Sequence, residues 1–215
     1  MDYLLFIGHF AVAYALIRLF PSVPPLVLLI GVGFPDILWP ILILIGVEQA
    51  VINPNSPLQK HIKFTYYPFS HSLVLASIIA CIPGLVLALT ITPLAGILFV
   101  VASASHWLLD TIVHLNDLPI AGLRQDAKVG LGLWKYQKAA FALEYIFYAI
   151  VTSLIMPAKF VVPLLVVGAI FHLLNANSFL GFTKTNPFKT DRAYAVITLI
   201  GFIGMSLVVN YVLTF

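Results

Sequence analysis

The chain has 215 residues, of which 61% are hydrophobic and only 9% charged, and its mean hydropathy is +1.06. Soluble domains carry about 25% charged residues, so this composition excludes an ordinary soluble protein and indicates an integral membrane protein. The net charge of +3 is too small to indicate a nucleic-acid partner, and the single cysteine, Cys81, excludes an internal disulfide.

Long apolar segments separated by short polar ones predict an all-α fold, in which about seven transmembrane helices form a single membrane-embedded domain over residues 1–215. The N-terminus has no basic region and no clear cleavage site, so we expect it to begin the first span and not to be a signal peptide. The expected spans are about residues 3–20, 25–47, 68–90, 92–115, 139–156, 160–176 and 193–215.

Ionisable residues interrupt the first three expected spans. His9 lies early in the first, and Asp36 follows Pro35 in the middle of the second. A proline in mid-span, followed by an acid, suggests a broken helix aimed at a cavity. A polar stretch over residues 48–67 precedes the third span, which has His71 in its first turn. Ionisable side chains inside a membrane span are costly and usually face an interior site.

The fourth span carries the most informative pattern, because His106, Asp110 and His114 are spaced i, i+4, i+8. Each four-residue step turns a helix about 40° past one full turn, so the three side chains share one face. Histidine and aspartate serve both as metal ligands and as acid–base groups. The alternative is a polar packing seam between helices, with the histidines bonded to backbone or serine.

The segment over residues 116–138 is the longest polar connection. It contains Lys128 followed by Gly130 and Gly132, and two glycines beside a lysine can bring backbone N–H groups close to an anion. A flexible amphipathic connector is the alternative. Beyond it, Glu144 lies near the start of the fifth span and His172 near the end of the sixth.

Lysine and arginine are distributed asymmetrically. The connections after the second, fourth and sixth spans hold nine of them, against Arg18 and Lys159 on the other side. By the positive-inside rule the N-terminus and these connections are cytoplasmic, in the cell (inner) membrane. Some of these residues can instead bind substrate. The nine are Lys60, Lys63, Arg124, Lys128, Lys135, Lys138, Lys184, Lys189 and Arg192.

With this topology the candidate ligands share one depth. At about 1.5 Å rise per residue, all lie within roughly 15 Å of the cytoplasmic surface. Imidazole with carboxylate, without thiolate, suits a divalent metal such as Zn, with Mn or Fe as alternatives, and eight groups allow one to three ions. The predicted metal ligands are His9, Asp36, His71, His106, Asp110, His114, Glu144 and His172.

Several short motifs resemble those of the YdjM-type membrane-bound metal-dependent hydrolases, over about residues 1 to 145. The matching stretches are Gly8-His9, Pro35-Asp36, Ser70 to Leu73 and Ser105 to Asp110, together with Asp117-Leu118-Pro119 and Lys128 to Trp134. That family is distantly similar to the zinc-dependent phospholipase C and single-strand nuclease superfamily, whose helical enzymes hold three clustered zinc ions.

The resemblance implies roles for individual residues. Asp36, His71, His106 and Asp110 would hold one ion, and Asp110 would bridge to a second ion served by His9. The superfamily completes that second site with its N-terminal amine and tryptophan, whereas this chain begins with Met1. His114, Glu144 and His172 would supply a third site, although their order and spacing depart from the superfamily pattern.

These observations predict a metal-dependent hydrolase of a phosphoester, in particular a lipid head group, with membrane lipids as its partners. A metal ion lowers the pKa of bound water, which then attacks phosphorus; Asp36, His71 and Asp110 are the expected catalytic residues. Alternatives are a metal-ion or proton-coupled transporter, against which no inverted repeat is visible, and a non-catalytic metal-stabilised membrane factor. The expected substrate-binding residues are Tyr67, Arg124, Lys128, Trp134 and Lys135.

Overall fold

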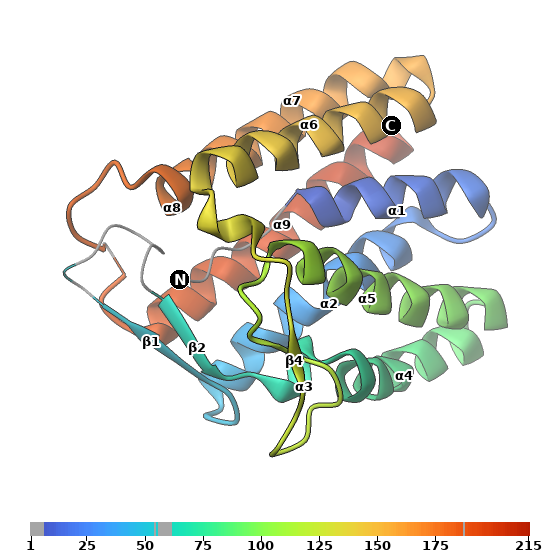
Figure 1. Ribbon diagram of the computed structural model, residues 1–215. Helices are drawn as coiled ribbons and strands as arrows, with labels where there is room; N and C mark the ends of the chain where they lie inside the picture. The colour runs from blue at the N-terminus through green and yellow to red at the C-terminus, as the bar shows by residue number, and fades with distance from the viewer. Residues whose placement is uncertain (1–6, 54, 56–61, 187) are drawn as a thin grey trace.

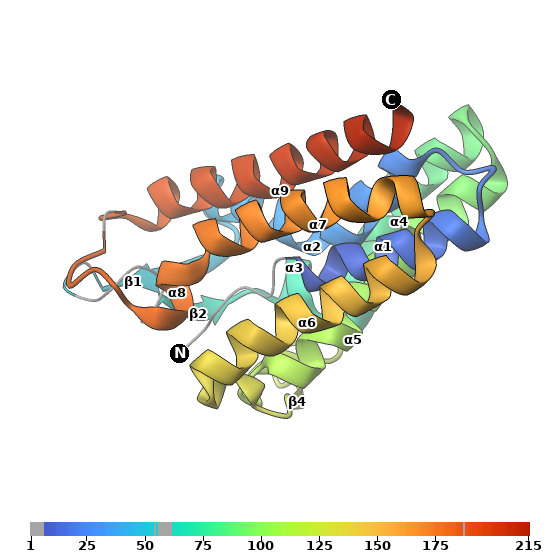
Figure 2. The ribbon, with the colours of Figure 1, turned by 90° about the horizontal axis from the view of Figure 1, so that it is seen from above.

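The computed structural model describes residues 7–53, 55, 62–186 and 188–215. In this part of the chain, seven helices of 12 or more residues run side by side along one axis in alternating directions (Figure 1, Figure 2). The predicted all-α character is confirmed. The seven are α1 (Gly8–Leu19), α2 (Pro25–Leu44), α4 (Leu73–Thr90), α5 (Pro93–Val113), α6 (Gln137–Ile155), α7 (Ala158–Leu174) and α9 (Asp191–Thr214).

Five of these helices, α2, α4, α5, α6 and α9, are long and apolar enough to cross a membrane. Helices α1 and α7 are apolar but shorter. The first expected span begins at Tyr3, and residues 1–6 lie outside the described residues. The structure therefore indicates a membrane protein and supports five of the seven expected spans by length.

Helix α4 has one buried face of small residues and one exposed apolar face. Its buried residues are Ala76, Ala80 and Gly84, one turn apart, whereas large apolar side chains such as Ile82 are exposed. A Cβ atom at Gly96 of α5 would lie only 2.3 Å from the carbonyl oxygen of Gly84. Small residues thus let α4 and α5 approach closely, as in membrane helix pairs, and the outer apolar face fits a lipid environment.

The expected break in the second span is absent, because α2 is continuous through Pro35 and Pro40. Each proline lacks an N–H group and deprives the carbonyl four residues earlier of its helical donor. The break lies instead in the third expected span, between α3 (Pro68–His71) and α4. Ser72 is extended there; its hydroxyl donates to the Pro68 carbonyl and accepts from the Ala76 N–H.

The polar connections gather at one end of the bundle (Figure 1). The polar stretch over residues 48–67 contains the antiparallel pair β1 (Gln49–Ile52) and β2 (Ile62–Tyr66), called here the β1–β2 hairpin. The connection after α5 contains the antiparallel pair β3 (Leu118–Pro119) and β4 (Lys128–Val129), then the 3-10 turn η1 (Leu133–Lys135); α8 (Ala176–Leu180) follows α7. The opposite end has only short turns between helices, so the two ends differ in chemistry.

Candidate metal centre

Six ligand-type side chains converge at the end of the bundle that carries the hairpins. They come from α1, α2, α3, α5 and the C-cap of α5, and each is at most 8% exposed. Two sets of three offer ligand atoms within 4.8 Å of one another and can hold a metal ion: His9, His106 and Asp110, and Asp36, His71 and His106. The six residues are His9, Asp36, His71, His106, Asp110 and His114.

Asp36 lies between two histidines. Its Oδ1 atom is 3.1 Å from His71 Nε2, and its Oδ2 atom is 3.5 Å from His106 Nε2. His106 Nε2 is also 3.3 Å from Asp110 Oδ2. A tetrahedral zinc ion with bonds of about 2.0–2.1 Å keeps its ligand atoms about 3.3 Å apart. The spacing within each of the two sets of three, Asp36 with His71 and His106, and His9 with His106 and Asp110, therefore suits one ion.

Asp110 also faces more than one histidine. Its Oδ1 atom is 3.4 Å from His9 Nε2, while Oδ2 faces His106 and lies 3.8 Å from His114 Nε2. His114 is not inside α5, as the i, i+4, i+8 pattern predicted, but forms its C-cap with an extended backbone. The two oxygens of one carboxylate thus point to different imidazoles, which is the arrangement that a bridging ligand needs.

Three of the histidines form a hydrogen bond through Nδ1, the ring nitrogen that points away from the carboxylates of the centre. His106 Nδ1 lies 2.7 Å from the Val32 carbonyl, His71 Nδ1 lies 2.7 Å from Ser70 Oγ, and His114 Nδ1 lies 2.9 Å from Asp117 Oδ1. A carbonyl can only accept, so Nδ1 of His106 carries a proton. Such outer partners fix the tautomer of metal-binding histidines. When Nδ1 holds the proton, Nε2 presents a lone pair to a carboxylate oxygen, and only a second proton or a metal ion between them removes the repulsion.

Glu48 supports His71 through Ser70 and was not among the predicted site residues. Its Oε1 atom accepts hydrogen bonds from the backbone N–H groups of Phe69 (2.7 Å) and Ser70 (2.9 Å), and its Oε2 atom accepts from the Ser70 hydroxyl (2.6 Å). Burial raises the pKa of Glu48, although the Ser70 and Phe69 donors and the His71 charge oppose that shift. One signal was available: Glu48 is the only acidic residue between Asp36 and Asp110.

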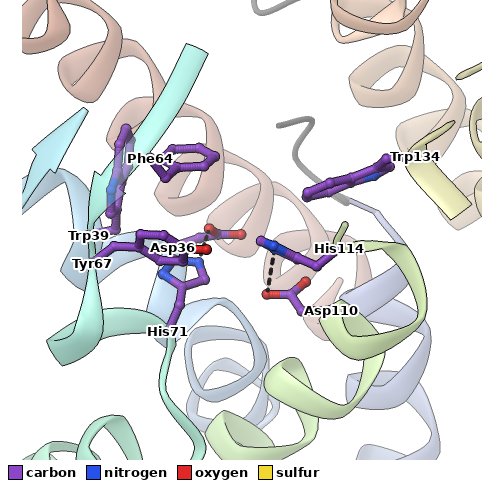
Figure 3. Close-up of a pocket in the computed structure, with 8 residues that line it drawn as sticks. All are labelled: Asp36, Trp39, Phe64, Tyr67, His71, Asp110, His114 and Trp134. Atoms are coloured by element: carbon purple, nitrogen blue, oxygen red, sulfur yellow. Dashed lines mark hydrogen bonds and ion pairs between the residues drawn. The ribbon is translucent and has the colours of Figure 1, made fainter. Parts of the chain in front are cut away.

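A small pocket opens above these ligands, with aromatic walls (Figure 3). Tyr67 and Trp134, which were predicted substrate-binding residues, line it together with Trp39 and Phe64, which were not predicted. The phenol of Tyr67 donates to the Asp117 carbonyl at 2.8 Å, and the Trp134 ring packs against His114 with 4.4 Å between centroids. The remaining lining residues are Asp36, His71, Asp110 and His114.

The predicted cationic residues lie elsewhere. Arg124, Lys128 and Lys135 are exposed and do not line this pocket. The expected anion cradle is also not formed by the N–H groups of Leu131 and Gly132, which donate to the carbonyls of Thr111 and His114. The glycine-rich stretch therefore caps the end of α5, where a Cβ atom at position 130 would lie 2.3 Å from the His114 carbonyl oxygen.

Glu144 and His172 form a separate buried pair, with 3.7 Å between Glu144 Oε2 and His172 Nδ1. Glu144 Oε1 accepts hydrogen bonds from the backbone of Ile7 (2.8 Å) and Gly8 (3.3 Å). A carboxylate at this position satisfies the free N–H groups at the start of α1. Neither residue belongs to the candidate metal sets found among the described residues. The structure thus places Glu144 as a cap for the helix that carries His9.

Comparison with protein families, with curated proteins and with solved structures finds no match to this chain.

Proposed function

We propose that the chain is a membrane-embedded, metal-dependent hydrolase of the YdjM type that cleaves a phosphoester of a lipid head group. One observation carries the proposal. Asp36 and Asp110 each lie between the Nε2 atoms of two histidines. Two of these histidines, His71 and His106, form a hydrogen bond through Nδ1 on the opposite side of the ring. Paired carboxylates and imidazoles beside a pocket are the usual ligands of hydrolytic metal centres.

In this proposal Asp36, His71, His106 and Asp110 hold one divalent ion, with Zn expected and Mn or Fe as alternatives. Asp110 and His9, whose Oδ1 and Nε2 atoms lie 3.4 Å apart, would hold a second ion. A bound divalent ion supplies a nucleophile at neutral pH, because it lowers the pKa of a coordinated water. Asp36 and Asp110 line the pocket, so either carboxylate can accept the proton that this water releases.

The substrate site would be the aromatic pocket itself, with Tyr67 and Trp134 against the head group. Amphipathic aromatic rings prefer the membrane interface. The exposed cations Arg124, Lys128 and Lys135 would attract anionic lipid surfaces from outside the pocket.

Topology completes the proposal: seven spans, with the N-terminus and the metal centre on the cytoplasmic side of the cell membrane. The positive-inside rule supports it, since eight of the nine Lys and Arg residues named above are exposed at the end of the bundle that carries the ligands, six on connections and two, Lys138 and Arg192, in the first turns of α6 and α9. The ninth, Lys60, lies outside the described residues.

A transporter is the rival function, and the interior of the bundle argues against it. Between the metal centre and the far end lies a core that includes the apolar Leu29, Val32, Ala102 and Phe202, each 0% exposed, and the polar side chains buried there among the described residues carry hydroxyl groups and no carboxylate or imidazole. An ion path requires polar groups along its length, and both candidate metal sets of the described residues lie at the same end.

The test combines elemental analysis of purified protein with assays on mixed lipid vesicles. The proposal expects a bound transition metal and release of either a phosphorylated head group or inorganic phosphate, both lost in Asp36→Asn. Protein that folds but neither binds Zn²⁺, Mn²⁺ or Fe²⁺ nor releases phosphate would contradict it. Metal uptake into sealed proteoliposomes without hydrolysis would establish the rival.

A further inference from the structure

We infer that Glu48 is a positioning residue that sets the tautomer of His71 through the hydroxyl of Ser70, so that Nε2 of His71 is free to bind a cation. This inference rests on the proposed metal centre. It assigns a specific task to a side chain in the connection before β1, outside the helices that carry the other ligands.

The direction of each hydrogen bond carries the argument. Glu48 Oε1 already accepts from two backbone N–H groups, which fixes the orientation of the carboxylate. Its Oε2 atom therefore faces Ser70 Oγ at 2.6 Å and accepts the hydroxyl proton. With its proton given to Glu48, Ser70 Oγ has only lone pairs left for His71 Nδ1 at 2.7 Å. Nδ1 of His71 must then hold the ring proton.

The consequence appears on the other side of the ring. His71 Nε2 lies 3.1 Å from Asp36 Oδ1 inside the pocket. If Nε2 carried the only ring proton, it would donate a normal hydrogen bond to Asp36, and neither atom would be open to a metal. The Glu48–Ser70 pair disfavours that arrangement in the neutral ring, so the contact between Nε2 and Asp36 at 3.1 Å is left for a second proton or a cation. The three hydrogen-bonded residues are all buried: Glu48 is 2%, Ser70 0% and His71 8% exposed.

Glu48→Gln tests the inference because it keeps the shape and reverses the polarity. The amide oxygen must still accept from Phe69 and Ser70, so the amide NH₂ group faces Ser70 Oγ and donates to it. The Ser70 hydroxyl is then free to donate to His71 Nδ1. His71 changes to the Nε2–H tautomer and bonds to Asp36. We expect a loss of metal affinity of about 10–100-fold, as for changes in the partners of metal-binding histidines.

Ser70→Ala separates this role from simple packing. In Ser70→Ala the hydroxyl that links position 48 to His71 is absent. Glu48→Gln can then no longer change the tautomer of His71, so it should reduce metal affinity little further in the Ser70→Ala background. If Glu48 only supported the fold of α3, the two losses would add. Asp126→Asn is the matched control, because Asp126 also accepts a backbone N–H in a connection, from Gly122 at 2.6 Å, and is not among the residues that line the pocket.

The experiment has two readouts. Nitrogen-15 NMR of histidine-labelled protein, at alkaline pH without metal, reports the protonated nitrogen of His71, and Co²⁺ titration reports affinity. We expect Nδ1–H in the wild type, Nε2–H in Glu48→Gln, and non-additive affinities. Nε2–H in the wild type, or additive losses, would overturn the inference, and the wild-type spectrum decides even if a variant does not fold. The expected tautomers in a protein that binds no metal would instead count against the proposed function alone.

Discussion

The imidazole rings of His9 and His106 lie face to face, with 3.6 Å between centroids and 7° between the ring planes. Through this stack α1 meets α5, and both rings direct Nε2 toward Asp110, His9 to Oδ1 at 3.4 Å and His106 to Oδ2 at 3.3 Å. The two histidines are nevertheless not equivalent, because only His106 also reaches Asp36, at 3.5 Å.

This difference predicts unequal effects of two substitutions. His106→Ala removes a group shared by both candidate metal sets, so we expect loss of all tightly bound metal. His9→Ala leaves Asp36, His71 and His106 in place and should remove at most one ion per chain. Metal stoichiometry after size-exclusion chromatography distinguishes the two. Equal metal content in both variants would show that the two sets are not separate sites.

Helical periodicity and depth predicted much of this centre from the sequence. His106 and Asp110 are one turn apart, and His9, Asp36 and His71 lie at matching depths in helices of alternating direction, so their convergence follows from bundle geometry. His114 lies beside the other ligands but not in the predicted helical conformation, because the end of α5 is set by the glycine-rich connection that folds back onto it.

The other features depend on contacts between distant segments. Glu48 and Ser70 are 22 residues apart and meet only because the β1–β2 hairpin returns the chain to the end of α2. That same hairpin brings Phe64 of β2 against Trp39 of α2 in an edge-to-face contact at 5.1 Å, and both rings line the pocket. No local sequence pattern marks such residues. The cationic residues predicted to bind substrate, Arg124, Lys128 and Lys135, are exposed and lie outside the pocket.

The close crossing of α4 and α5 predicts a stability difference between two glycines. Gly96→Ala places Cβ 2.3 Å from the Gly84 backbone oxygen, so a helix must shift, at a cost of about 1–3 kcal/mol typical of overpacking. Gly204→Ala in α9 has no atom within 4 Å of its new Cβ among the described residues. It should be neutral or stabilising, since alanine favours helices. Thermal unfolding of the two variants in the same detergent tests this prediction. Equal melting temperatures would contradict the close approach of α4 and α5 at Gly84 and Gly96.

The connection after α5 yields a second glycine comparison. Gly130 and Gly46 both have positive φ, +154° and +78°, but only at Gly130 would a Cβ atom meet backbone, at the His114 carbonyl. We expect Gly130→Ala to displace His114 and weaken Co²⁺ binding. Gly46→Ala should cost only the backbone strain of about 1–2 kcal/mol and leave binding unchanged. Wild-type affinity in Gly130→Ala would show that His114 is not held by this connection.

The proposed topology can be tested with the chain's single cysteine as the starting point. In a Cys81→Ser background, single cysteines replace Lys135, at the ligand end of the bundle, or Lys159, beside the turn between α6 and α7; both positions are exposed. An impermeant maleimide added to intact cells should label position 159 and not 135. Labelling of both positions from the same side would mean that α6 does not cross the membrane.

The last comparison sets Asp110→Asn against His114→Ala. Asparagine keeps the size of Asp110 but removes the negative charge that offsets the repulsion between two ions, and in a buried site that loss is poorly screened. It also removes an oxygen ligand that faces His106 at 3.3 Å, whereas His114 lies farther away, at 3.8 Å. We therefore expect Asp110→Asn to lower the bound-metal count and to reduce hydrolysis by more than the ~10–100-fold typical of residues behind the ligands. His114→Ala should cost less, because water can replace its imidazole.

Metal stoichiometry and phosphate release, measured for both variants in matched detergent, decide between the roles. Asp126→Asn serves as control, since it removes a carboxylate of the same type that bonds Gly122 away from the pocket. Wild-type metal content and turnover in Asp110→Asn would exclude a bridging role for Asp110. A larger defect in His114→Ala would move the reactive centre toward Trp134, which packs against His114 at the mouth of the pocket, because His114 and its partner Asp117 would then hold the essential ion.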